Sequence, residues 1–236
     1  MKPKVLAAIG AGILLAAAGR AQTAPDPQLM QEINRIAAID DHTHIPKVVA
    51  PGEKDDDYDA LPCAPLEPTA DPTMVRPDNP LFLQAWKALY GYPYSDKAPE
   101  HLQELRQTRE RVRREQGDHF PAWVLDKLNI RYMLANRIEM GPGLPAPRFL
   151  WVPYDDALLV PLNNQALASE NPDRKFFFSR EEMLLRRYLK ESGLNAVPAT
   201  LDDYLARVVV PTLERQKKAG AVAIKFEAAY LRSLNF

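Results

Sequence analysis

The sequence predicts an α/β fold built on a parallel sheet that is covered on both faces. Short, almost continuously apolar runs alternate with longer stretches of helical periodicity, as expected for strands buried on both sides. The order is strand, helices, strand, strand, helices, strand, which favours parallel pairing. The 236 residues, 46% of them hydrophobic and with a net charge of -1, suit one globular domain with a sizeable core.

Four segments are candidate strands, and polar residues follow each of them. They are residues 36–39, 130–135, 148–152 and 221–226. Only the Gly/Pro-rich residues 141–147 clearly separate the second strand from the third. A regular helical crossover needs more residues than this. The sequence therefore leaves open whether a helix is missing there or the strand assignment is shifted.

Helical periodicity fills most of the remaining chain. Residues 26–35 predict a short helix, and residues 79–126 predict a helical region that forms, with the Pro- and Asp-rich residues 46–80, an insert of loop and helix over 46–128. The capping-box pattern Ser179-x-x-Glu182 predicts the start of another helix. A last helix is expected to begin near Thr200, to kink at Pro211 and to stop at Gly220.

The first residues have the pattern of a secretory signal. Lys2 and Lys4 precede the apolar run 5–18, and small residues follow up to Ala21. The run is shorter than the roughly 20 residues that cross a bilayer. We expect cleavage after Ala21, which makes residues 1–21 a signal peptide and leaves 22–236 as a secreted or periplasmic protein without stable membrane association.

Charge and cysteine content narrow the function classes. A near-neutral net charge with interleaved acidic and basic residues offers no field for phosphate binding, so nucleic acid is not an expected partner. The single cysteine, Cys63, cannot form an internal disulfide, and no His or basic residue beside it in sequence favours a thiolate. A small-molecule substrate is the expected partner.

The cluster Asp40-x-His42-x-His44 is the clearest chemical motif. Side chains alternate along a strand, so these three residues share one face at the end of the first candidate strand. Imidazoles and a carboxylate are suitable ligands for Zn²⁺ or a similar divalent transition metal. Asp40 is either a ligand or an outer partner that fixes a histidine tautomer. The alternative is a pair of incidental surface histidines.

A strand that ends in Asp-x-His-x-His near the mature N-terminus resembles the amidohydrolase superfamily. The resemblance implies a (β/α)8 barrel of the TIM type with its site at the C-terminal strand ends. It also implies that Lys225, at the end of the fourth candidate strand, is a metal ligand, carbamylated where two ions are bound. The stretch Lys225-x-x-x-Ala229-Tyr230-x-Arg232 is similar to the amidohydrolase-related branch that includes nodulin-like domains fused to glutamine synthetase.

Further polar residues lie where a barrel of this type contacts its substrate. The candidates are Arg137, Tyr154, Asp155, Tyr230 and Arg232. A guanidinium offers a planar fork for an anionic group of the substrate. For Tyr230 and Arg232 the alternative is the ordinary polar start of a helix.

The expected function is metal-dependent hydrolysis of an amide, an ester or a related bond, with one or two metal ions. Four strands predict only the N-terminal half of an eight-stranded barrel, with a helical insert between strands 1 and 2. The resemblance assigns the general-base aspartate to the half that is missing, so we expect a truncated chain and leave its own activity open. Alternatives are a single-metal decarboxylase or isomerase of the same superfamily, and an exported, non-catalytic binding module. A homo-oligomer is compatible with the sequence.

Overall fold

The computed structural model of the protein describes residues 25–231 apart from 51, 59–78, 160–163 and 171. The chain divides after Arg35 into two units. In the first unit the structure describes helix α1 (Pro27–Arg35), which has no buried residue. The expected signal peptide lies outside the described residues. Everything below concerns the second unit, residues 36–236.

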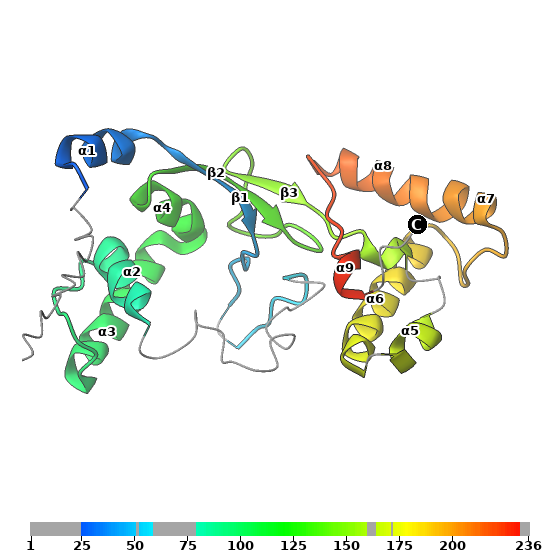
Figure 1. Cartoon of the computed structure of the whole chain (residues 1–236), viewed down its shortest axis with the longest axis horizontal. Coiled ribbons are helices and arrows are strands. Elements are labelled where there is room, and N and C mark those ends of the chain that lie inside the picture. Colours follow the sequence, from blue (N-terminus) through cyan, green and yellow to red (C-terminus); the bar gives the residue numbers. More distant parts are fainter. Residues whose placement is uncertain (1–24, 51, 59–78, 160–163, 171, 232–236) are drawn as a thin grey trace, which may run out of the picture. The chain divides into compact units, whose positions relative to one another are not determined.

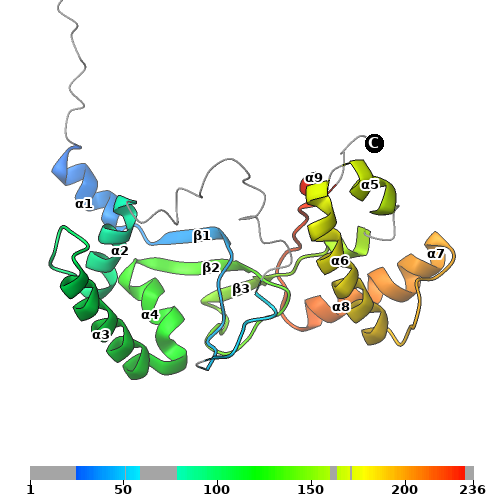
Figure 2. The ribbon, with the colours of Figure 1, turned by 90° about the horizontal axis from the view of Figure 1, so that it is seen from below.

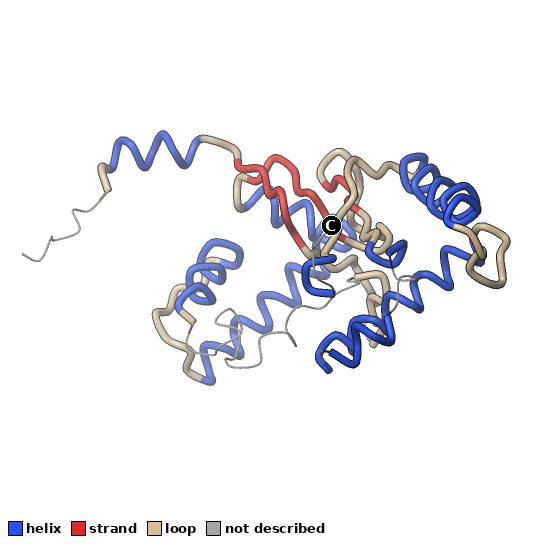
Figure 3. The backbone as a smooth tube through the Cα atoms, turned by 45° about the vertical axis from the view of Figure 1, so that its right-hand side comes forward, coloured by secondary structure: helices blue, strands red, loops and turns tan. Residues whose placement is uncertain are grey.

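A small, open sheet of three parallel strands forms the centre of this unit. The strands β1 (Ala38–Thr43), β2 (Ile130–Asn136) and β3 (Phe149–Val152) pair in sequence order, β2 between the other two. Figure 3 shows them side by side. The predicted α/β class with parallel pairing is confirmed. The sheet is not closed.

The fourth predicted strand lies beside β3 but forms only two isolated bridges. Trp151 pairs with Ala221 and Tyr154 pairs with Lys225, both in the parallel sense. Backbone hydrogen bonds support this pairing, since Val222 N donates to Trp151 O at 2.9 Å and Lys225 N donates to Pro153 O at 2.9 Å. The segment 221–225 therefore continues the parallel order of the sheet, and it brings Lys225 to the level at which β3 ends.

The helical region predicted over residues 79–126 is confirmed. Among the described residues between β1 and β2 the helices are α2 (Pro80–Tyr90), α3 (Pro99–Gln116) and α4 (Phe120–Lys127), with a 3-10 turn at Gly117–His119 between the last two. Each helix has proline in its first turn, where no backbone N–H is needed. The Asn79 side chain caps α2, and Gly91 ends it in the left-handed conformation. Figure 2 shows α3 and α4 next to each other below the strands.

The short connection from β2 to β3 contains no helix, which settles the question left open by the sequence. Residues 137–148 cross between two directly paired parallel strands as an irregular loop. Glycine is required in this loop because the neighbouring segment comes very close. A Cβ on Gly143, whose φ is +80°, would lie 2.5 Å from Val48 Cγ2, and one on Gly141 would lie 2.5 Å from Lys47 Cδ.

The second group of helices follows β3. A 3-10 turn (Asp156–Leu159) leads to α5 (Asn164–Glu170), α6 (Pro172–Glu191) and a continuous helical stretch made of α7 (Leu201–Tyr204), a π-helical turn (Leu205–Val209) and α8 (Val210–Lys218). The Thr200 side chain caps α7, as predicted. The irregularity expected at Pro211 is a π turn just before it, where an insertion in the hydrogen-bond ladder accommodates the proline.

The predicted capping box at Ser179 was wrong. Ser179 lies well inside α6, which already begins at Pro172. The long apolar side chains Phe177 and Phe178 are buried, so packing extends the helix past a sequence pattern that is also compatible with a helix interior.

Two hydrophobic clusters hold the helices to the sheet. One joins α4 to β2 and β3 and is formed by Ala122, Leu125, Met133, Leu144 and Phe149. The other packs α6 and the stretch 204–208 around the end of β3, and its members include Tyr154, Leu184, Tyr188, Tyr204 and Val208. Figure 1 shows these helices and strands with their labels.

The first strand differs from its prediction in extent and burial. It runs through Thr43, so Asp40, Asp41 and His42 belong to the strand and not to a loop after it. It is largely exposed, and Ile39 has half of its surface accessible. The exposure follows from its position at the edge of the sheet, where β2 is its one partner among the described strands. Within the described part of the chain, no helix is long and apolar enough to span a membrane.

Candidate metal centre

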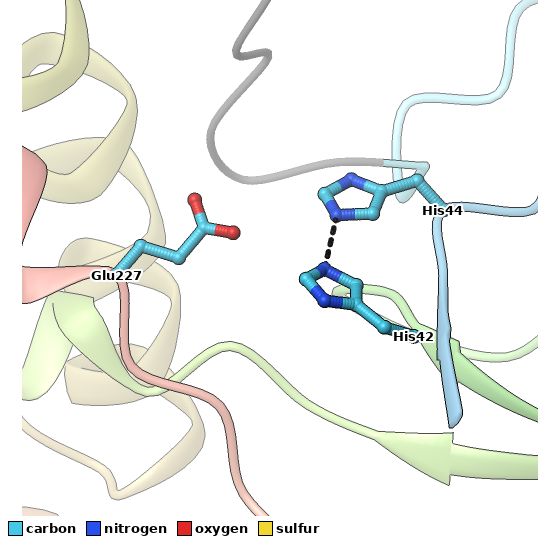
Figure 4. A group of neighbouring side chains, drawn as sticks. All are labelled: His42, His44 and Glu227. Atoms are coloured by element: carbon cyan, nitrogen blue, oxygen red, sulfur yellow. Dashed lines mark hydrogen bonds between the residues drawn. The ribbon is translucent and has the colours of Figure 1, made fainter. Parts of the chain in front are cut away.

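The rings of His42 and His44 lie next to each other. His42 Nε2 lies 3.3 Å from His44 Nε2, and the rings are stacked with their centroids 5.4 Å apart. Figure 4 shows both rings side by side at the end of β1, on the side that faces Glu227. His42 belongs to β1, and His44 directly follows the end of the strand at Thr43. The pairing of β1 with β2 is irregular between Asp40 and Thr43, so the rings lie together, as the spacing His-x-His predicted, without a regular strand running through both residues.

Lys225 reaches the same place from the other edge of the sheet. Its Nζ is 2.8 Å from His42 Nε2 and 3.4 Å from Glu227 Oε1. The parallel bridge between Tyr154 and Lys225 positions its backbone. Residues 183 positions apart are thus brought into contact, and the sequence-based expectation that Lys225 lies near His42 agrees with the geometry.

Glu227 completes a group that can hold a metal ion. One ligand atom each of His42, His44 and Glu227 lies within 4.8 Å of the others. The sequence analysis missed Glu227, although it stands two residues after Lys225 and so on the same side of an extended segment. Two imidazoles and one carboxylate are a ligand set of catalytic zinc sites, which keep a fourth position for water or substrate.

Asp156 holds Glu227 in position. The Glu227 backbone N–H donates to both carboxylate oxygens of Asp156 at 2.8 Å. Asp156 is fully buried and Glu227 is 5% exposed. Burial raises the pKa of Asp156 to about 6, with a smaller contribution from the charge of Glu227. Asp156 was not predicted, because nothing in its local sequence separates it from Asp155.

The side chain of Tyr154 contacts His44. Its hydroxyl lies 3.0 Å from His44 Nδ1 and 3.4 Å from His44 Nε2. The ring is fully buried, and the Tyr188 hydroxyl donates to its backbone carbonyl at 3.2 Å. The structure places Tyr154, predicted as a substrate contact, directly beside His44.

The electrostatic surroundings of His42 favour its neutral form. Desolvation lowers the pKa of His42, and electrostatic interaction with Lys225 and His44 lowers it further against the opposing effect of Asp41 and Asp40. A neutral imidazole is the form that binds a metal. The local environment is therefore compatible with a ligand role.

Asp40, in β1, is outside the three-residue group. Its Oδ1 accepts a hydrogen bond from the backbone N–H of His42 at 3.2 Å. This contact fixes the local strand geometry.

Two further candidates differ from the sequence-based expectation because they are fully buried. Arg137 donates to both carboxylate oxygens of Asp55 at 2.8 Å and to Ile45 O at 2.6 Å, so it anchors a loop and offers no surface to a substrate. Asp155 accepts a hydrogen bond from Gln216 Nε2 at 2.8 Å, and burial raises its pKa to about 6. Their positions just after strands predicted that Arg137 and Asp155 lie near the site. The packing of the fold buries both side chains.

The remaining two candidates cannot be located in the site. Tyr230 belongs to the short helix α9 (Ala228–Leu231), but its side chain is not described. Arg232 lies outside the described residues.

Comparisons with models of protein families, with curated proteins and with solved structures found no match to this chain. The geometry of the site and the sequence motifs therefore carry the functional argument.

Proposed function

We propose that the group formed by His42, His44 and Glu227 binds a divalent transition metal ion, with Zn²⁺ as the first candidate. The observation that carries the proposal is the convergence of three suitable ligand atoms within 4.8 Å at the ends of parallel strands. Zn²⁺ accepts imidazole nitrogen and carboxylate oxygen together, and tetrahedral coordination by three protein ligands leaves one position open. The donor set therefore fits the ion.

Each neighbouring residue has a defined task in this proposal. The Tyr154 hydroxyl fixes the ring of His44, and the Asp156 carboxylate fixes the backbone of Glu227. Outer partners of this kind orient metal ligands and raise affinity. Lys225 lies against both His42 and Glu227 and either balances the charge of the carboxylate or, when carbamylated, becomes a ligand itself.

The activity that we propose is hydrolysis of a small amide, ester or related substrate. When bound, an ion of this kind supplies Lewis-acid chemistry that activates water and polarises a scissile carbonyl group. Support comes from the parallel order β1-β2-β3 followed by 221–225, with the polar residues at the C-terminal strand ends. This is how the first half of a (β/α)8 barrel is arranged, and we propose that fold and the amidohydrolase relationship on this basis.

A second candidate is a single-metal decarboxylase or isomerase of the same superfamily. It is favoured by the contacts of the Lys225 side chain, whose Nζ lies 3.4 Å from Glu227 Oε1 and 2.8 Å from His42 Nε2, because an ammonium group in this place balances the charge of the ligand carboxylate without binding an ion itself. In the described part of the chain one metal-binding group is found. One bound ion with an unmodified lysine would support this candidate, and two ions with carbamylated Lys225 would support the hydrolase.

We further propose export directed by residues 1–21, in keeping with the charged and apolar pattern of that segment. A metal site that faces solvent is compatible with loading of the ion outside the cytoplasm.

The test is metal binding by the full chain. Zinc affinity is measured by competition with a chromophoric chelator, and metal content by elemental analysis. We expect the double variant His42→Ala/His44→Ala to bind zinc at least hundredfold more weakly than the wild type, because it lacks two of the three proposed ligands. The variant His119→Ala, which removes an exposed histidine from the 3-10 turn, is the control. Equal zinc binding by both variants would contradict the proposal and favour a non-catalytic module.

Hydrolysis is then assayed with a panel of small esters and amides, with zinc-loaded wild-type chain and the double variant. Turnover that depends on both histidines supports the hydrolase. Zinc binding without turnover on the panel, but with release of CO2 from a carboxylate panel, would replace it by the lyase candidate.

A further inference from the structure

A cavity separate from the histidine group lies between α3, α4 and the segment 45–48. Its volume is about 560 Å³, within the range of small-molecule sites. Ile45, Phe120, Val124, Leu125 and Met133 form much of its apolar lining. Leu125 and Met133 belong to the hydrophobic cluster that joins α4 to the sheet, so the cavity extends from a packed core and has a fixed inner wall.

Three arginines of α3 line the same cavity. Arg106, Arg109 and Arg113 follow one another at spacings of three and four residues, which places them on one face of the helix. All three are exposed. Arg113 donates to Val49 O at 3.3 Å. In the part of the chain that the structure describes, Arg106 and Arg109 have no carboxylate partner, so their positive charges are available to a ligand.

Opposing charges in the cavity are few. Glu110 is the one acidic residue of the lining, against three guanidinium groups. Lys47 also lines the cavity, but its ammonium group is paired with Asp57 at 3.3 Å and with Asp55 at 3.8 Å. The cavity thus combines an apolar inner wall with a cationic rim.

We propose that this cavity binds an amphipathic monocarboxylate, whose apolar body fills the space above Leu125 and Met133 and whose carboxylate pairs with Arg106 and Arg109. Charge complementarity favours an anionic ligand, because the rim has an excess of guanidinium groups, which form charge-assisted, bidentate hydrogen bonds with carboxylates. The apolar lining decides against a small polar anion, since inorganic phosphate would leave it uncovered. This site is independent of the proposed metal centre.

The experiment uses the full chain and dodecanoate below its micelle-forming concentration, with binding followed by titration calorimetry. We expect saturable binding at one site. The double variant Arg106→Gln/Arg109→Gln should bind at least tenfold more weakly, because two charge-assisted contacts are lost. The matched control is Arg114→Gln, an exposed arginine of the same helix outside the cavity lining, which should bind within twofold of the wild type.

Two further measurements separate a built site from general attraction. The neutral analogue dodecanol should bind more weakly than dodecanoate, and its weaker binding should be insensitive to the arginine variants. Val124→Trp, which fills the cavity and leaves every charge in place, should abolish dodecanoate binding while circular dichroism shows an unchanged fold. Equal loss in Arg114→Gln, equal affinity for dodecanol, or unaffected binding in Val124→Trp would each overturn the proposal.

Discussion

Two fully buried charged side chains, Arg137 and Asp156, anchor opposite sides of the candidate metal centre. Arg137 binds Ile45 O directly after His44, together with the carboxylate of Asp55. Asp156 binds the backbone N–H of Glu227. The histidine side of the site is therefore held through a loop, and the carboxylate side through one short contact.

The two anchors differ in how their charge is compensated. The guanidinium of Arg137 meets the carboxylate of Asp55 in a bidentate pair at 2.8 Å, which offsets the cost of burying both charges. Among the described residues no cation pairs with Asp156, and burial raises its pKa to about 6. The comparison indicates that Arg137 stabilises the fold. The buried carboxylate of Asp156, whose burial is energetically unfavourable, instead holds the backbone of Glu227 in place.

The largest expected effect is a loss of stability when Arg137, the buried residue whose charge is paired, is replaced. Arg137→Met keeps the length of the side chain but removes the guanidinium from the carboxylate of Asp55, whose side chain is 8% exposed. Lys47 stays as the remaining partner, through its backbone N–H at 2.7 Å and its ammonium group at 3.8 Å. We expect a loss of about 3 to 5 kcal/mol in the free energy of unfolding, as for other broken buried ion pairs. Urea denaturation followed by circular dichroism measures it. The exposed Arg131, in the strand β2 that ends just before Arg137, provides the control variant Arg131→Met.

The double variant Arg137→Met/Asp55→Leu sharpens this prediction. Removal of both charges should recover part of the stability, because an apolar pair avoids the unpaired buried charge. A double variant no more stable than Arg137→Met would mean that the contacts to backbone carbonyls, rather than the ion pair, hold the loop.

The next largest expected effect is a loss of zinc affinity when Asp156, the buried carboxylate without a paired cation among the described residues, is replaced. Asp156→Ala removes the acceptor for the Glu227 N–H, and we expect zinc affinity to fall about 10- to 100-fold, the usual effect of losing an outer partner. Chelator competition measures it. Asp156→Asn keeps one acceptor oxygen and should retain more of the affinity than Asp156→Ala. Identical zinc affinity in wild type and both variants would show that Glu227 needs no such support.

The smallest effect is the pH dependence of the Asp55 pair. Although burial raises the pKa of Asp55, the hydrogen bonds from Arg137 and from the Lys47 backbone outweigh it, and the pKa lies below the ordinary value of 3.8. The stabilisation is therefore present above pH 3.8 and is lost as the pH falls through the lowered pKa. We expect the stability difference between wild type and Asp55→Asn to shrink below that pH. A constant difference across the acid range, or the same trend in the exposed control Asp56→Asn, would contradict this assignment.

Much of the fold followed from local pattern. Near-continuous apolar runs identified β2 and β3 almost to the residue. Helical periodicity identified the helices between β1 and β2 and the helix that begins after Thr200. The start of α6 was missed because Ser179 is a good cap by type but is surrounded by buried phenylalanines that continue the helix. The exposure of β1 was missed because burial depends on neighbouring strands and helices, which local sequence does not specify.

The sequence predicted the histidine part of the candidate site, in which the residues are neighbours in the chain. The proximity of His42 and His44 was expected from their spacing of two, which is visible in the sequence, and the rings do lie together. Glu227 and Asp156 were not found, because their relation to the histidines exists only after residues 221–227 lie beside β3. Arg137 and Asp155 were found as strand-end residues, but their inward orientation came from partners far along the chain, Asp55 and Gln216.

The sequence by itself determined the parallel α/β class and the paired histidines, because periodicity and spacing are properties of neighbouring residues. Only the tertiary structure decided that Glu227 joins His42 and His44, that Arg137 anchors a loop, and that three arginines of α3 border an apolar cavity. These arrangements depend on distances between residues remote in the chain, and burial and pairing energies fix such distances when the strands and helices pack.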